Sequence, residues 1–490
     1  MKPPHSNSAC NCFTLGWARF RQIVLVLALA SGFSPIGQSA SPGDLRTADQ
    51  VRQLTAAEAA KSLPVRVRGV VTFFDASLYS RFVQDQTAGI YFQQLTNLPT
   101  LQAGQEVEIE GTTSPGEYAP IIVPTRVQIL GTGNFPTARP VNAADLASGS
   151  QDSQFVEISG IVRSVRFEEE SQYFLLEIMA GGERFTAYAR TLPVTEPGVL
   201  VDSTVKVRGV CSTLFNRLRQ LFGFRLLVPR PEDLIVEIPA PANPFDTAAQ
   251  PINSLLRFTP QGTYGHRVKV KGTVSYQESG RAVFIQDETE GLYAQTRQRT
   301  SLNPGDIVEV LGFPAKGEYT PMLQDAIYRK TGDGRPPGPV DLTVNELLKG
   351  AHDCRLVRLR ANLLERTQRG REQFFVLESG GFSFPAYFSQ EADVTGLDRF
   401  LNNSELAVTG ICLIERGSGW QAGESWRAKS FRLLLPATTS VVVLAEPPWW
   451  TQPNKLRVAG ICSISALALL VFMDVLRRRP KATQSDRTAQ

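Results

Sequence analysis

The chain of 490 residues contains few of the side chains that most often carry catalysis or bind metals. It has six cysteines and three histidines, and no pair of them has the spacing of a zinc site. It also lacks a nucleophile elbow, a Walker loop and the His-Glu-x-x-His motif. We therefore expect no catalytic activity and no cofactor. Carboxylates are plentiful, but one sequence does not separate a catalytic pair from solvated surface acids.

The first forty residues have the order of a secretory signal. Arg19 and Arg21 precede an apolar run at 23–30, and small residues follow up to Ala40. A basic region, an apolar region and small residues are typical of a signal peptide, here residues 1–40. The run is shorter than the roughly 20 residues that span a bilayer. The alternative is an uncleaved anchor.

The other end predicts a membrane-spanning helix at 456–476. Residues 458–473 carry no charge, Trp449 and Trp450 precede them, and three arginines follow. Trp favours the membrane interface, and clustered arginines stay on the cytoplasmic side. We expect a single-pass protein of a bacterial inner membrane, with a large periplasmic part and a cytoplasmic tail at 477–490. The expected interface residues are Trp449, Trp450, Arg477, Arg478 and Arg479.

The net charge of +4 belongs to the two ends. Residues 1–40 and 455–490 carry ten of the 51 basic residues and two of the 47 acidic ones, which leaves the middle at −4. A nucleic-acid binder is expected to carry a positive field. The acidic balance therefore argues against nucleic acid as a partner.

The middle of the chain is a duplication. Phe-Val-Gln-Asp at 82–85 returns as Phe-Ile-Gln-Asp at 284–287, and Gly-Glu-Tyr at 116–118 returns at 317–319. A second module follows each copy: 155–162 matches 356–363, and Leu-Leu-Glu at 175–177 matches Val-Leu-Glu at 376–378. The predicted modules are A (41–140), B (141–240), A′ (241–340) and B′ (341–445).

Cys211 and Cys412 lie at matching places in B and B′. One interpretation is a disulfide between the halves. The favoured one is that both are small buried residues, because strand positions in separate modules seldom meet at disulfide distance.

The modules consist mostly of strands. Alternating segments such as Val-Arg-Val-Arg at 65–68 and Glu-Val-Glu-Ile-Glu at 106–110 indicate strands with one buried face. Short helices are expected near 47–61, 141–146 and 342–348, with Gly149 and Gly350 ending the last two. The order of strands, glycines and turns resembles the OB-fold, a five-stranded Greek-key barrel, most clearly in A and A′. The predicted fold is mainly β: about four tandem OB-like barrels, short connecting helices and one C-terminal transmembrane helix.

Few recurring residues are candidates for ligand binding. Asp85 and Asp287 end a strand at a turn, where they contact a ligand or, as we favour, form an Asx-turn. Glu117, Tyr118, Glu318 and Tyr319 lie in the loop before the last strand, which flanks the OB binding face. The tyrosines there either stack on a base or sugar, or pack onto the barrel, which we favour.

Two further features have bland interpretations that we favour. Arg81 and Arg281 are expected to be solvated. The segment 214–227, with Phe222 and several arginines, is expected to be a long hairpin, although an aromatic and basic contact surface is the alternative.

The whole arrangement resembles the exported ectodomains of bacterial membrane-bound sensor histidine kinases. The residues that carry the resemblance are Val-Arg-Val-Arg-Gly-Val-Val at 65–71, the 82–90 segment, the strand ending at Gly111 and the C-terminal span. Only eleven residues follow Arg479, without a histidine to accept phosphate. The resemblance thus implies a sensor without a kinase domain.

Three functions remain open. The first is a membrane-anchored periplasmic binding or sensory protein, with a small-molecule, glycan or protein ligand and a separate signalling partner such as a histidine kinase. The second is an envelope scaffold that binds protein or glycan without signalling. The third, nucleic-acid binding, rests on fold analogy alone.

Overall fold

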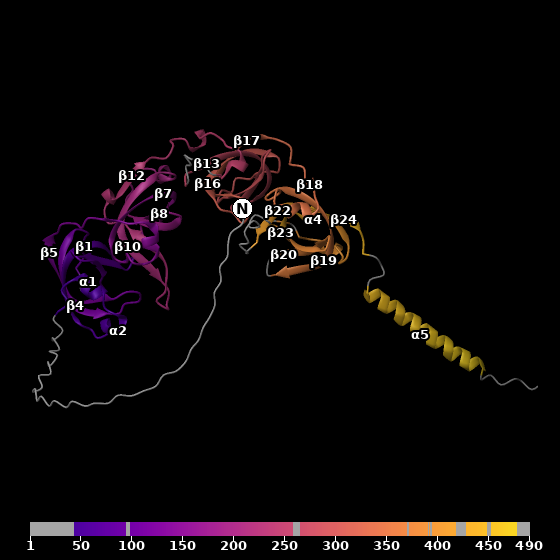
Figure 1. Ribbon diagram of the computed structural model, residues 1–490, viewed down its shortest axis with the longest axis horizontal. Helices are drawn as coiled ribbons and strands as arrows, with labels where there is room; N and C mark the ends of the chain where they lie inside the picture. Colours follow the sequence, from indigo (N-terminus) through magenta and orange to yellow (C-terminus); the bar gives the residue numbers. More distant parts are fainter. Residues whose placement is uncertain are drawn as a thin grey trace, which may run out of the picture. The chain divides into compact units, whose positions relative to one another are not determined.

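The computed structural model describes residues 44–94, 99–257, 265–369, 372–390, 392, 394–417, 428–447 and 452–477. Within these ranges the chain forms four β-sheets, one after another along the sequence (Figure 1). The predicted signal peptide, Trp449, Trp450, Arg478 and Arg479 lie outside them.

The first and third sheets are built from five strands each. The first contains β1 (Pro64–Asp75), β2 (Ser80–Gln84), β3 (Gly89–Tyr91), β4 (Gln105–Ser114) and β5 (Ile121–Thr132). The third contains β13 (Val268–Glu278), β14 (Ala282–Gln286), β15 (Gly291–Gln295), β16 (Asp306–Ala315) and β17 (Met322–Asp333). The third closes into a barrel, and a parallel bridge between Phe92 and Ile122 joins β3 to β5 in the first.

The second and fourth sheets are built from seven strands each. The second contains β6 (Arg139–Pro140), β7 (Phe155–Glu168), β8 (Tyr173–Ala180), β9 (Glu183–Ala189), β10 (Thr204–Phe215), β11 (Leu221–Leu227) and β12 (Leu234–Ile238). The fourth contains β18 (Val340–Asp341), β19 (Leu356–Arg369), β20 (Glu372–Ser379), β21 (Phe382–Phe388), β22 (Glu405–Arg416), β23 (Ala428–Leu435) and β24 (Val441–Ala445).

All four sheets share one strand order. The first of the five core strands pairs with the second and the fourth, and the third runs parallel to the fifth. This is the connectivity of a small Greek-key barrel. The predicted fold class is confirmed: the protein is mainly β, with small barrel-like sheets and an apolar C-terminal helix.

The structure corrects the sequence alignment in two places. β6 pairs with β7, so residues 139–140 contribute to the second sheet although we assigned them to module A. The match of 175–177 with 376–378 is wrong by two residues. Ile178 lies opposite Phe185, and Leu377 lies opposite Phe384, so the two hairpins align at Ile178 and Leu377.

Short capped helices lead into the sheets. The expected helix at 47–61 is two helices, α1 (Ala48–Arg52) and α2 (Ala56–Ala59), because Thr55 starts a second capping box. Helices α3 (Ala143–Ala147) and α4 (Val344–Leu347) begin after Asn142 and Thr343. Gly149 and Gly350 follow them with φ of 77° and 89°, values that favour glycine.

Each barrel has an apolar interior of its own. Cys211 is buried in the core of the second sheet and Cys412 in that of the fourth, and both are free thiols. The favoured interpretation as buried small residues is therefore correct. Burial raises the pKa of Cys211 to about 12, so its thiol is not the thiolate that forms disulfides.

Helix α5 (Gln452–Arg477) is the only described helix long and apolar enough to cross a membrane, and its candidate span is Lys455–Asp474. None of that window is buried against the rest of the described protein. Arg477 is the last described residue of α5.

Modules A and B join through main-chain contact at Gly89, and A′ and B′ join in the same way at Gly291. The Gln154 side chain accepts from Gly89 N at 3.0 Å and donates to Gly89 O at 3.2 Å. A Cβ atom on Gly89 would overlap the Ser153 carbonyl oxygen, and one on Gly291 would overlap that of Cys354. Glycine is required at both places because backbone approaches backbone there.

We predict that Gly89→Ala destabilises the A–B joint by about 1–3 kcal/mol, since the added methyl group forces the two backbones apart. Gly198→Ala is the matched control, because nothing lies within 4 Å of its added Cβ. Thermal unfolding of the full chain checks the difference. Equal melting temperatures for the two variants would contradict the assignment.

Candidate ligand pockets between paired modules

A pocket of about 660 Å³ lies between modules A and B. Module A supplies the start of β2, Tyr91 of β3 and the loop 116–121, and module B supplies residues 152–153 and the β10–β11 hairpin. Six aromatic side chains line it: Tyr79, Phe82, Tyr91, Tyr118, Phe215 and Phe222. Its size falls within the range of ligand sites.

A second pocket of about 530 Å³ occupies the equivalent place between A′ and B′. The repeated lining residues include Phe284, Tyr293 and Asp353, which match Phe82, Tyr91 and Asp152. The duplication therefore repeats a cavity as well as a barrel.

A buried aspartate lines each pocket, Asp152 in the first and Asp353 in the second, and we call this part of the pocket its floor. Asp152 accepts hydrogen bonds from Thr213 Oγ1 at 2.7 Å and Arg52 Nη1 at 3.3 Å. Asp353 accepts from Thr320 Oγ1 at 2.6 Å and from Ile414 N at 2.8 Å. Because these bonds occupy the carboxylates, both aspartates position the second module against the first.

Asp75 connects the two modules beside the first pocket. It accepts hydrogen bonds from Ser77 Oγ at 2.6 Å, from Tyr173 Oη at 2.8 Å, and from Arg190. Burial alone would raise the pKa of this carboxyl, but the hydrogen bonds from Ser77, Tyr173 and Arg190 outweigh it and lower the pKa to about 2. Asp75 belongs to module A, whereas Tyr173 and Arg190 belong to module B. The charge of Asp75 therefore helps to hold the two modules together.

Three of the four predicted ligand residues in the loops before the last strands line a pocket, and Tyr319 does not. Glu117 and Tyr118 line the first pocket, and Glu318 lines the second. Tyr319 packs beside the fourth barrel's core and would collide with any Cβ on Gly350. A ligand role for these side chains stays a prediction.

Asp85 and Asp287 make the favoured Asx-turns. Asp85 Oδ1 accepts from Thr87 N at 2.7 Å, and its Oδ2 accepts from Ala48 N at 2.7 Å. Asp287 repeats the arrangement with Thr289 N at 2.7 Å and Ile252 N at 2.8 Å. Neither residue lines a pocket, and each instead fastens the segment that precedes its barrel.

Sequence reasoning missed Tyr79 as a pocket residue, and it named Phe222 only within the less favoured interpretation of a contact surface. Tyr79 and Phe222 line the first pocket with 75% and 69% of their surface exposed. The predicted long hairpin at 214–227 exists as β10 and β11, and its Phe215 and Phe222 line the cavity, whereas Phe224 is buried in the core of the second sheet. The aromatic residues of the 214–227 segment were the available signal for its part of the pocket. Arg81 is not solvated as expected: it is 1% exposed and donates to Tyr91 Oη at 3.1 Å.

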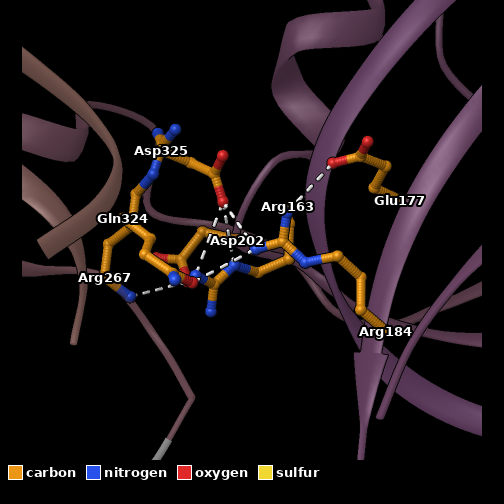
Figure 2. Close-up of polar contacts among 7 residues, drawn as sticks. All are labelled: Arg163, Glu177, Arg184, Asp202, Arg267, Gln324 and Asp325. Atoms are coloured by element: carbon orange, nitrogen blue, oxygen red, sulfur yellow. Dashed lines mark hydrogen bonds and ion pairs between the residues drawn. The ribbon is translucent and has the colours of Figure 1, made fainter. Parts of the chain in front are cut away.

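An ionic cluster joins module B to module A′ (Figure 2). Arg163, 3% exposed, donates to Asp325 at 3.4 Å, and Arg184 donates to the same carboxylate at 3.1 Å. Asp202 accepts from Arg267 N and lies 3.0 Å from His266 Nδ1. Burial lowers the pKa of Arg163 to about 10, while Asp325 partly offsets that effect.

The cluster belongs to this joint alone among the repeated positions. In B′ the equivalents of Arg163 and Asp202 are Leu364 and Asn403, as their shared hydrogen bonds with neighbouring backbone show. No described module follows B′, and there the charges are absent. The charges are therefore found where module B contacts module A′.

Comparisons with known proteins add little. No family model matches the chain, and no curated protein matches it. Among solved structures, an OBody bound to hen egg-white lysozyme has a TM-score of 0.18 and 12% identity over 22% of this chain and 98% of that chain. A replication protein A heterotrimer bound to ssDNA has a TM-score of 0.20 and 8% identity, and the match covers 64% of this chain and 96% of that chain. Aspartyl tRNA synthetase from Entamoeba histolytica has a TM-score of 0.17 and 19% identity, and the match covers 31% of this chain and 30% of that chain. These scores are too low to carry an argument.

The described residues contain no group of three or more His, Cys, Asp or Glu side chains arranged to hold a metal ion. The two clefts have both apolar and charged lining residues.

We predict that Asp75→Asn lowers the melting temperature of the full chain at neutral pH, because Tyr173 and Arg190 lose a charged acceptor. A carboxyl whose folded-state pKa is depressed stabilises the fold above its ordinary pKa and loses that contribution as pH falls toward 2. The difference between the two proteins should therefore be largest above about pH 4 and shrink toward pH 2. A pH series of thermal scans checks this, with exposed Asp333→Asn as control. A difference independent of pH would contradict the role of the charge.

We also predict that Asp325→Asn weakens the B–A′ joint by about 2 kcal/mol, because two arginines lose their shared anion. Hydrogen exchange should quicken in β7 and β17. Asp398→Asn is the control. It also removes an ion pair, in this case with Arg366, but the Asp398 carboxylate is fully exposed. Unchanged exchange in Asp325→Asn would show that the cluster does not hold the joint.

Proposed function

We propose that the protein is a membrane-anchored, exported binding and sensory protein. Its ligands occupy the clefts between paired modules, and a separate signalling chain, such as a histidine kinase, receives the signal through the membrane helix. It has no catalytic activity of its own. The proposal includes an inner-membrane location, with the barrels in the periplasm and the C-terminal tail in the cytoplasm.

The repeated pocket is the observation that carries this proposal. Each cavity takes its walls from two modules, so a ligand in it contacts both and changes how firmly they are held. Ligand sites prefer such joints between domains. The duplication has kept a cleft of similar size at both joints.

The apolar helix α5 supports the second part of the proposal. Only six residues separate the end of β24 at Ala445 from the start of α5 at Gln452. A chain of that length reaches at most about 25 Å. The last barrel is thus tethered closely to the helix, and a change in the barrels has a short path to the membrane.

Exchange of α5 for an unrelated membrane span tests the signalling role. The deletion strain of the native host is complemented with the wild-type chain or with the exchanged chain, and the transcripts of both are compared. We expect the wild type to restore transcript levels and the exchanged chain to fail, although it is equally abundant in the membrane.

Restoration by both chains would favour an envelope scaffold, because a scaffold needs only an anchor. No transcript change in the deletion strain would contradict a sensory role. Reporter fusions at residue 447 and at the C-terminus check the orientation, and an inward-facing barrel region would overturn the location.

A further inference from the structure

The two pockets share equivalent residues at the floor, around Asp152 and Asp353, but differ at the tip of the hairpin, which we call the mouth. Phe215 pairs with Leu221 at the tip of the β10–β11 hairpin, and Arg416 pairs with Ala428 at the same place between β22 and β23. Phe222 and Lys429 are therefore equivalent, because each is the next residue of its strand. Tyr79 and Arg281 are equivalent as well, since each precedes the first residue of the second strand.

Three aromatic residues of the first pocket thus correspond to three basic residues of A′ and B′, and of these three Arg281 lines the second pocket. Tyr79, Phe215 and Phe222 line the first pocket, and Phe215 stacks on Tyr118 with ring centroids 6.0 Å apart. Arg281 lines the second pocket, and Arg416 and Lys429 are exposed at the equivalent places. The floor is repeated, so the mouths determine what each cleft accepts.

The aromatic mouth suits a ring with apolar faces. Exposed aromatic side chains are costly to leave in water, and they gain most from a flat partner that covers them. A sugar ring offers C–H groups on its faces and hydroxyl groups around its edge. The hydroxyl groups can donate to Glu117, whose carboxylate is exposed beside the rings.

The charges of the first pocket argue against a phosphate-bearing ligand. Glu117 and Asp152 are acidic, and the cations nearby are engaged by the protein. Arg225 donates to Ser80 Oγ at 3.2 Å, and Arg219 donates to Pro115 O at 2.9 Å and to Glu117 O at 3.2 Å. An anionic nucleotide would have to displace these hydrogen bonds before Arg219 or Arg225 could bind its phosphates, and Glu117 would repel it.

We propose that the first pocket binds the neutral sugar rings of a glycan, and that the second pocket does not. This rests on the proposed binding function and names its ligand class. Tyr79 and Phe222 provide the stacking surface, and Glu117 accepts hydrogen bonds from the sugar hydroxyls. The second pocket lacks aromatic counterparts of Tyr79 and Phe222, and its own further aromatic residues, Tyr387 and Phe388, come from β21.

Binding of short neutral oligosaccharides of glucose, galactose and N-acetylglucosamine to the full chain in lipid nanodiscs tests the proposal. Saturation-transfer NMR and calorimetry give the readouts. The triple variant Tyr79→Arg, Phe215→Arg, Phe222→Lys copies the second mouth onto the first and should weaken binding at least about tenfold. The reverse variant Arg281→Tyr, Arg416→Phe, Lys429→Phe should retain the first site and gain a second.

Glu117→Gln keeps the rings and should weaken binding less than the triple variant. Circular dichroism and melting temperature show that each variant is folded, and Gly198→Ala serves as a variant remote from the pocket. No binding of any neutral oligosaccharide by the wild type, or undiminished binding by the folded triple variant, overturns the proposal. So does binding of mononucleotides or aromatic peptides in preference to the sugars.

The ligand class and the sensory role can be refuted independently, because they are tested by different experiments. If sugars bind but exchange of α5 leaves the transcripts restored, the ligand class stands and the sensory role falls. If exchange of α5 abolishes the response but no sugar binds, the sensory role stands and the ligand class falls.

Discussion

The contact between the backbones of paired modules is the constraint on which the rest of the structure depends. Gly89 and Gly291 lie against the carbonyls of Ser153 and Cys354, where no side chain fits. This contact fixes the distance between two barrels, and Asp152 and Asp353 fasten the adjoining loops. A cleft of defined width results beside each contact, and the duplication repeats both the contact and the cleft.

Charged groups and shared apolar clusters hold the modules to one another, whereas the apolar interiors stabilise each barrel. Asp75 ties B to A, and the cluster around Asp325 ties A′ to B. Buried ion pairs are weak contributors to stability, because desolvation offsets their attraction, but they lose much when one partner is removed. They therefore specify which surfaces meet. The replacement of Arg163 by Leu364 in B′ agrees with this, since no described module follows there.

The barrels could be predicted from the sequence because their causes are local. Alternating strands, turn residues such as Asp85 and the helix-ending residue Gly149 act on their near neighbours, and all three appear as expected. The pockets could not be predicted, because they depend on residues brought together from separate modules. Tyr79 and Phe222 are more than 140 positions apart, and nothing in either segment shows that they share a cleft. Arg81 was misjudged for a similar reason: its partner Tyr91 is on the next strand, and their hydrogen bond allows burial.

Hydrogen exchange of the full chain in nanodiscs, with and without a saturating neutral oligosaccharide, tests most directly whether the clefts between modules are the binding sites. The account predicts that protection rises together in the 115–121 loop of module A and the 214–222 hairpin of module B, with no rise in the matching segments of A′ and B′. Protection confined to a single module, or appearing only on a barrel face away from the joint, would contradict it.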